Sequence, residues 1–226
     1  IPFKGYDFIG GPSTFMRNLK TYFDNVGYKY KSDISKSKHI FFPISYDLAS
    51  LKKIKKDKGA IIQRLDGIYY PQKHGASYQE KNKLIKDIYL NYATKVVFQS
   101  QYSKAQCFKL FGEKDTDDYE IIINGVNEAI FYPSSTFKEA PKKFKLVTTG
   151  NFRNIDMLEP VIKALDAISK FDFELHIVGP IVNDKLHDLI NRDYVICHGV
   201  KKTNEIADLL REHHIFMYSH LNPPCP

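Results

Sequence analysis

Three short apolar runs in the second half of the chain end in glycine: KLVTTG at residues 145–150, ELHIVG at 174–179 and VICHG at 195–199. Each run has the length of a buried strand, and helical periodicity follows at 158–171 and 203–212. Buried strands that alternate with helices are typical of a parallel sheet in an α/β domain. This half therefore predicts a Rossmann-like domain with a further strand at 215–218.

The first half of the chain repeats this alternation. Short apolar runs predict strands at residues 39–44, 60–64, 95–100 and 120–123. Helical periodicity is present at 13–25 and 78–93. Between the halves, residues 133–143 are rich in Pro, Ser, Thr and Lys, which indicates an interdomain linker. We predict α/β architecture with two Rossmann-like domains, at residues 1–135 and 143–226.

Both predicted domains are expected to be cut at their outer ends. No strand precedes the Gly10-Gly11 turn within the chain, and Pro226 falls in a connection between a strand and a helix. The second domain is also shorter than the roughly 100 to 150 residues that a domain usually holds. We therefore expect the second domain to be incomplete.

The composition is that of a globular protein, with 43% hydrophobic residues. No apolar run approaches the roughly 18 residues that span a membrane, and no signal peptide opens the chain. We therefore expect a soluble, cytoplasmic protein. Cys107, Cys197 and Cys225 are widely spaced without a CxxC pair, which argues against a disulfide framework or a zinc site.

The formal net charge of +7 leaves two interpretations open. It is compatible with an anionic partner, such as phosphate or a membrane lipid, and also with a solvated lysine-rich surface. The densest basic stretch contains Lys52, Lys53, Lys55, Lys56 and Lys58. For this stretch we favour one solvated helix face over a contact with phosphate or membrane lipid.

Two motifs in the first half carry candidate chemistry. Gly10 and Gly11 precede a helix, where backbone N–H groups and the positive helix end can hold a phosphate, although Gly-Gly also makes a plain turn. Arg64, Asp66 and Gly67 follow a predicted strand, at the sheet edge where open α/β sheets bind ligands. A local salt bridge is the alternative for the charged pair. Asn124-Gly125 is interpreted as a plain turn.

In the second half, the glycine-ended strands predict a nucleotide crevice. Gly150, Asn151 and Arg153 follow the first of them, and an arginine there can bind a diphosphate in a bidentate way. Gly179 and Gly199 follow the next two and would let backbone approach a nucleotide. His39 and His176 are assigned to strand packing. His213 and His214 lack carboxylates at metal-ligand spacing, so no metal site is expected.

Taken in order, the motifs resemble glycosyltransferase family 4, retaining enzymes with two Rossmann domains that face each other across a cleft, the GT-B fold. The resemblance is carried by GGPSTFMRNL at 10–19, VVFQSQYSK at 96–104, IIINGVNEAIFYP at 121–133, LVTTGNFR at 146–153, FELHIVGP at 173–180 and the stretch 195–219. QRLDGIYY at 63–70 is similar to a subgroup of bacterial and viral-type members.

The resemblance implies a metal-independent hexosyltransferase of polysaccharide biosynthesis that needs no cofactor besides its nucleotide-diphospho-sugar co-substrate. The acceptor would be a carbohydrate, lipid-linked or protein-linked, and no nucleic acid partner is implied. By the resemblance, the donor-binding residues would be Gly10, Gly11, Gly150, Asn151, Arg153, Gly179, Gly199 and Val200. Arg64, Asp66 and Gly67 would lie on the acceptor side, with Asp66 and Arg153 as catalytic residues.

Two positions depart from the family pattern. Asp156 stands where the family has a donor-site lysine, and the paired-glutamate motif that grips the donor is expected only after Asn222 to Pro226. Two alternatives therefore stay open: a nucleotide-sugar epimerase of the same fold, which would need acid/base carboxylates, and a non-catalytic nucleotide-sugar-binding module.

Overall fold

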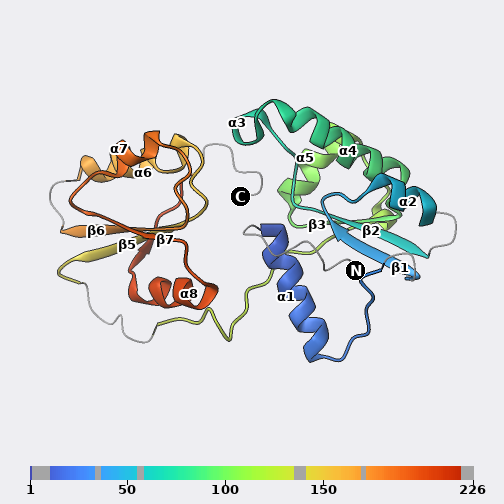
Figure 1. The fold of residues 1–226 in the computed structure, drawn as a ribbon, viewed down its shortest axis with the longest axis horizontal. Helices are drawn as coiled ribbons and strands as arrows, with labels where there is room; N and C mark the ends of the chain where they lie inside the picture. Colours follow the sequence, from blue (N-terminus) through green and yellow to red (C-terminus); the bar gives the residue numbers. More distant parts are fainter. Residues whose placement is uncertain (2–10, 34–36, 55–58, 135–140, 169–171, 220–226) are drawn as a thin grey trace. The chain divides into compact units, whose positions relative to one another are not determined.

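The structure, a computed structural model, describes residues 1, 11–33, 37–54, 59–134, 141–168 and 172–219 (Figure 1). The chain forms two compact units, which divide between Asn124 and Gly125. Each unit is built on its own four-stranded parallel sheet. The predicted α/β class with two parallel sheets is confirmed.

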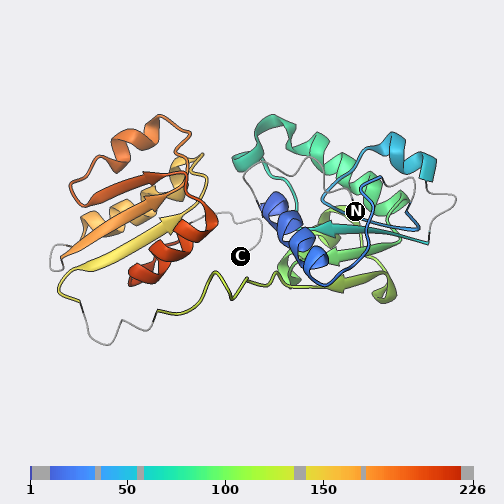
Figure 2. The ribbon, with the colours of Figure 1, turned by 60° about the horizontal axis from the view of Figure 1, so that its bottom comes forward.

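In the first unit, the strand order follows the chain. The strands are β1 (His39–Pro43), β2 (Ala60–Leu65), β3 (Lys95–Phe98) and β4 (Tyr119–Ile121). The helices are α1 (Gly11–Asn25), α2 (Leu48–Ile54), α3 (Pro71–His74), α4 (Tyr78–Asn91) and α5 (Gln101–Phe111), with 3₁₀ turns η3 (Gly75–Ser77) and η4 (Thr116–Asp118). Helix α1 lies on one face of the sheet, and α2, α4 and α5 lie on the other (Figure 2).

Side-chain alternation along β2 decides what each face buries. Ile61 and Leu65 point into the core under α4, and both are fully or almost fully buried. Burial of one such side chain stabilises the fold by about 1.5 to 3 kcal/mol. Arg64 immediately precedes Leu65, so its side chain points to the other face of the sheet, where it contacts Phe15 of α1. The charged side chain therefore lies on the face opposite the one that α4 covers.

In the second unit, the strand order is β7-β6-β5-β8, which is the order of the first four strands of a Rossmann sheet. The strands are β5 (Phe144–Thr149), β6 (Phe173–Val178), β7 (Val195–Gly199) and β8 (Ile215–Phe216). The helices are α6 (Glu159–Asp166), α7 (Lys185–Ile190) and α8 (Thr203–Glu212), with the 3₁₀ turn η5 (Ile155–Met157). Helices α6 and α7 cover one face of the sheet, and α8 covers the other (Figure 1).

Several predicted element ends differ from the structure, among them the strands predicted at 95–100 and 215–218, which end at Phe98 and Phe216. The strand predicted at 120–123 ends at Ile121, because its partner β3 ends at Phe98, which pairs with Ile121. Ile122 and Ile123 are consequently exposed rather than buried. The helix predicted at 158–171 ends at Asp166, after which the Ile168 N–H donates to Leu165 O in a tighter turn.

The segment after Asn124 belongs to the second unit. Arg211 of α8 donates from Nη1 to Ile130 O at 2.9 Å, and its guanidinium carbon lies 4.1 Å from the centroid of the Tyr132 ring. Residues 125–134 are therefore held by α8. Of the linker predicted at 133–143, residues 135–140 lie outside the described part of the chain.

Candidate functional site

In the first unit, the side chain of Arg64 connects the carboxyl ends of three neighbouring strands. Its Nη1 forms an ion pair with Asp66, which follows β2. Its Nη2 donates to Gln99 Oε1 at 2.9 Å and to Asn124 Oδ1 at 2.7 Å, after β3 and β4 respectively. Asn124 in turn donates to Gln99 Oε1 at 3.1 Å. The predicted pair is a local salt bridge within a larger polar network.

The Arg64 guanidinium is also covered by α1. Its central carbon lies 4.0 Å from the centroid of the Phe15 ring, and only 2% of the side chain is exposed. A cation over an aromatic face gains electrostatic attraction that strengthens when water is excluded. Arg64 therefore acts on neighbouring side chains and is closed off from solvent, whereas Asp66 remains 27% exposed.

Asp66 is the group of this network that can exchange protons. Burial raises the pKa of its carboxyl above the ordinary value, and the Arg64 guanidinium opposes that rise. The adjacent Gly67 has a φ of 146°, a backbone conformation that favours glycine, and its carbonyl oxygen accepts a hydrogen bond from Cys107 Sγ at 3.8 Å. The loop after β2 is therefore held on both sides of Asp66.

The amino end of α1 lies near this edge, because Phe15 in its second turn contacts Arg64. Gly11 begins the helix, and the first backbone N–H groups of a helix have no partner within it. Ser13 is fully buried, and its hydroxyl has no hydrogen-bond partner among the described residues. Gly10, the other predicted phosphate contact, lies outside the described residues.

In the second unit, the loops after the three glycine-ended strands meet through their backbones. The Gly150 N–H donates to Val178 O at 3.0 Å, and the Gly179 N–H donates to Gly199 O at 2.7 Å. The Phe152 N–H donates to Pro180 O at 2.9 Å, and Phe152 is buried. The structure thus brings Gly150, Gly179 and Gly199 together at one edge of the sheet.

Arg153 projects from this edge. It is exposed, and among the described residues its guanidinium has no hydrogen bond or ion pair, while its carbonyl oxygen accepts from Asn183 Nδ2 at 3.1 Å. Asn151 turns its Oδ1 into the protein, where it is buried without a partner in the described part of the chain. Val200 is 57% exposed. A fixed backbone therefore presents the Arg153 cation beside three glycine loops.

Sequence reasoning missed two groups of residues. Gln99 and Asn124 join the Arg64 network only because parallel pairing aligns the ends of β2, β3 and β4. In the second unit, His176 Nδ1 lies 2.8 Å from His198 Nε2, and the His213 ring stands edge-on to His176 with centroids 4.2 Å apart. Among the described residues, no group of His, Cys, Asp or Glu could hold a metal ion.

Neither a scan against family profiles nor a search of curated proteins finds a match to the sequence. Solved structures share the fold. HepE of Anabaena, solved with UDP-glucose, matches with a TM-score of 0.65 at 13% identity over 92% of this chain. The lipopolysaccharide outer core galactosyltransferase WaaB matches with 0.54 at 14% identity over 94%.

The N-terminal domain of a Candida albicans trehalose-6-phosphate phosphatase also shares the fold, with a TM-score of 0.53 at 17% identity over 93% of this chain. The chain spans 65% of the HepE chain and 57% of both the WaaB and the Candida chains. The TM-scores show a common fold with two Rossmann-like units, and at these identities the likeness extends to the fold alone.

Proposed function

We propose that this chain belongs to a glycosyltransferase that moves a sugar from a nucleotide-diphospho-sugar to a carbohydrate, lipid-linked or protein-linked acceptor. The observation that carries the proposal is the edge of the second unit, where Gly150, Gly179 and Gly199 meet and Arg153 stands exposed beside them. Glycine loops without side chains admit a ligand close to the backbone, and a guanidinium matches the oxygens of a diphosphate.

The donor would lie on the second unit. Its diphosphate would be held by Arg153 and the backbone around Gly150 and Gly179, and its nucleotide would lie near Gly199 and Val200, where nothing among the described residues stands within 4 Å of the place a Gly199 side chain would occupy. HepE, which shares the fold, was solved with UDP-glucose, and this makes a UDP-sugar the first donor to test.

The chemistry would be transfer with retention at the anomeric carbon. As the bond between the sugar and the diphosphate breaks, negative charge grows on the leaving phosphate, and a fixed cation such as Arg153 lowers the barrier by stabilising that charge. The leaving phosphate can accept the acceptor's proton, so neither a metal nor a dedicated base is needed. In the first unit, Asp66, held by its ion pair with Arg64, would serve on the acceptor side.

One observation favours an epimerase as a second candidate. Such an enzyme needs a carboxyl group that can donate and accept protons, and burial raises the pKa of Asp66 toward that role. The charged neighbour of Asp66 is Arg64, which opposes this rise in pKa. The observation supports proton exchange at Asp66 and leaves the reaction class to experiment.

The test is incubation of the protein with UDP-glucose and a panel of other nucleotide sugars, with and without candidate acceptors. Nucleoside diphosphate release that depends on an acceptor, with an α-linked product from an α-linked donor, would support the transferase. Conversion of one nucleotide sugar into its epimer would replace it with the second candidate. Donor binding by calorimetry without turnover would indicate a binding module.

A further inference from the structure

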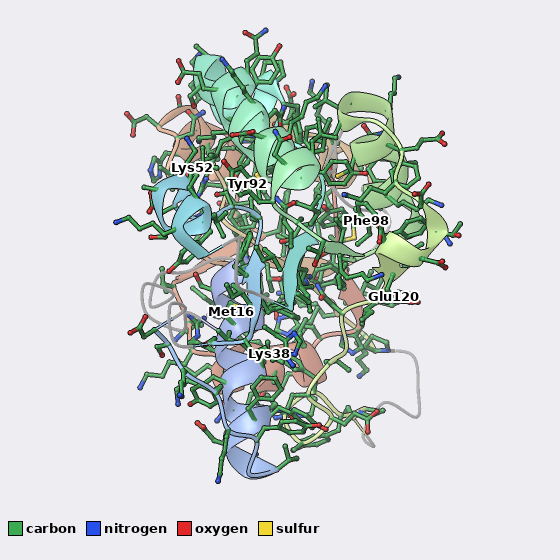
Figure 3. All side chains as sticks on the ribbon, turned by 90° about the vertical axis from the view of Figure 1, so that its right-hand side faces the viewer. Met16, Lys38, Lys52, Tyr92, Phe98 and Glu120 are labelled. Atoms are coloured by element: carbon green, nitrogen blue, oxygen red, sulfur yellow. The ribbon has the colours of Figure 1, made fainter. Side chains whose placement is uncertain are left out.

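The C-terminal end of α1 carries an exposed aromatic cluster that the proposed function does not use. The Met16 side chain of α1 is fully buried, and beyond Met16 the helix continues past the strands of the sheet (Figure 1 and Figure 3). Its last turn and the segment after it are 22-YFDNVGYKYK-31. Residues 20–31 are called the α1 tip below.

A helix-ending motif folds the α1 tip back on itself. Gly27 has a φ of +72°, the left-handed conformation that ends many helices, and the Tyr28 N–H donates to Phe23 O at 2.9 Å. The chain therefore turns so that the Tyr28 ring lies 5.4 Å from the Phe23 ring, the apolar contact that accompanies this motif. Tyr22 and Tyr30 pack on the same Phe23 ring, at 6.3 and 6.2 Å.

This cluster presents apolar surface to solvent. Tyr22 is 58% exposed, Val26 48% and Tyr28 66%. The Tyr22, Tyr28 and Tyr30 rings are tilted by 33° to 50° from the Phe23 ring, so together the rings form a knob rather than a flat platform. A flat ring face is what a sugar stacks on, whereas a knob with hydroxyl-tipped rings suits insertion among lipid headgroups, where tyrosine is enriched.

The charge of the α1 tip is positive. Its one carboxylate, Asp24, is bound by Lys20 Nζ at 2.7 Å and by the Tyr30 hydroxyl at 2.7 Å. Lys29 and Lys31 are exposed, and no carboxylate among the described residues pairs with their ammonium groups. Two such cations beside exposed tyrosines are the combination that holds a protein at an anionic lipid surface.

We propose that the α1 tip is a peripheral membrane contact that binds anionic phospholipid, with Tyr22, Val26 and Tyr28 entering the headgroup region and Lys29 and Lys31 pairing with lipid phosphates. None of the described helices is long and apolar enough to cross a bilayer. The inference stands independently of the proposed function, which rests mainly on the second unit.

The experiment is co-sedimentation of the full chain with vesicles of phosphatidylcholine alone and of phosphatidylcholine with phosphatidylglycerol. The parent should bind the anionic vesicles and not the neutral ones, and salt should weaken binding. Lys29→Glu with Lys31→Glu should lower the partition coefficient by at least about tenfold, because each lysine near such a surface contributes a several-fold gain. Tyr22→Ser with Tyr28→Ser should lower it by a similar factor through lost apolar contact.

The matched control is Lys83→Glu with Lys109→Glu, which makes the same change in net charge at exposed positions of α4 and α5. It should bind within about twofold of the parent, and circular dichroism should show all variants folded. The proposal is overturned if the parent ignores anionic vesicles, if the control loses as much as the tip variant, or if the tip variants bind a soluble polysaccharide less tightly while vesicle binding is unchanged. Nucleotide-sugar turnover, measured separately without vesicles, reports on the proposed function alone.

Discussion

Gly179 lies so close to Gly150 that a Cβ atom at Gly179 would stand 1.8 Å from the Gly150 carbonyl oxygen. The neighbouring atom is backbone, so no side-chain rotation relieves the contact. Gly179 also has a φ of 129°, a backbone conformation that residues other than glycine rarely adopt. Two loops that are far apart in the chain therefore meet at a distance that only glycine allows, and this approach shapes the edge assigned to the donor.

Gly179→Ala is expected to destabilise the second unit by at least about 2 kcal/mol, because it combines a backbone clash with a strained φ. Urea denaturation would measure the loss. Gly125→Ala is the control, since nothing among the described residues stands within 4 Å of a Cβ there, and it should change stability by less than about 1 kcal/mol. Equal stability of the two variants would contradict the observed approach of the loops.

Arg64→Met is expected to destabilise the first unit by about 3 kcal/mol. The substitution keeps most of the side-chain volume and leaves Asp66, Gln99 and Asn124 without their shared donor, a loss typical of broken buried ion pairs. Asp66→Asn should cost less, since Asp66 is partly exposed and an amide oxygen can still accept from Arg64. Chemical denaturation of both variants would reveal the order, and a larger loss for Asp66→Asn would argue against Arg64 as the centre of the network.

Arg153→Ala should leave stability unchanged within about 0.5 kcal/mol, because the side chain is exposed. In a protein with transferase activity, the same change should lower kcat by an amount that corresponds to about 2 to 4 kcal/mol of lost transition-state stabilisation. The effect on donor affinity should be smaller. Lys142→Ala removes an exposed cation that precedes β5, at the opposite end of that strand from Gly150, and serves as control. Steady-state kinetics that match the parent within about twofold would remove Arg153 from the site.

Stability of the second unit should fall as the pH drops below about 6.5, the ordinary pKa of histidine. Burial lowers the pKa of His198, and the neighbouring His176 and Lys201 lower it further. Burial also lowers the pKa of His213, and this effect outweighs the hydrogen bond with Leu209 O, which raises it. The folded state therefore binds fewer protons than the unfolded state, so the stabilisation is complete above the unfolded pKa and is lost as the pH falls through the lowered folded pKa values.

Urea denaturation at pH 7.5 and pH 5 would measure this dependence. His213→Gln should flatten it, because a glutamine side chain cannot take up a proton in the place where His213 Nε2 is buried without a partner among the described residues. His187→Gln, at an exposed position of α7, should leave the dependence as in the parent. An unchanged pH dependence in the His213 variant would contradict the assignment.

Much of the fold was predictable because its signals are local. Apolar runs that end in glycine identified β5, β6 and β7, and helical periodicity identified α1, α4 and α8, since each element buries one face at its own period. The predicted ends of β3, β4, β8 and α6 were wrong. Whether Ile122 is buried depends on the length of the neighbouring strand, which is a property of the partner and not of the residues around Ile122.

The candidate residues divide in the same way. Because Arg153 follows a predicted strand, the sequence was enough to predict that it lies at a strand end. The sequence likewise predicted that Arg64 and Asp66 form a charged pair at a sheet edge. The sequence by itself determined the order of strands and helices, because hydrophobic period acts over a few residues. Only the tertiary structure decided that Arg64 is buried and binds Gln99 and Asn124, or that Gly179 meets Gly150, because those contacts exist only after strand pairing aligns segments that are 29 to 60 residues apart.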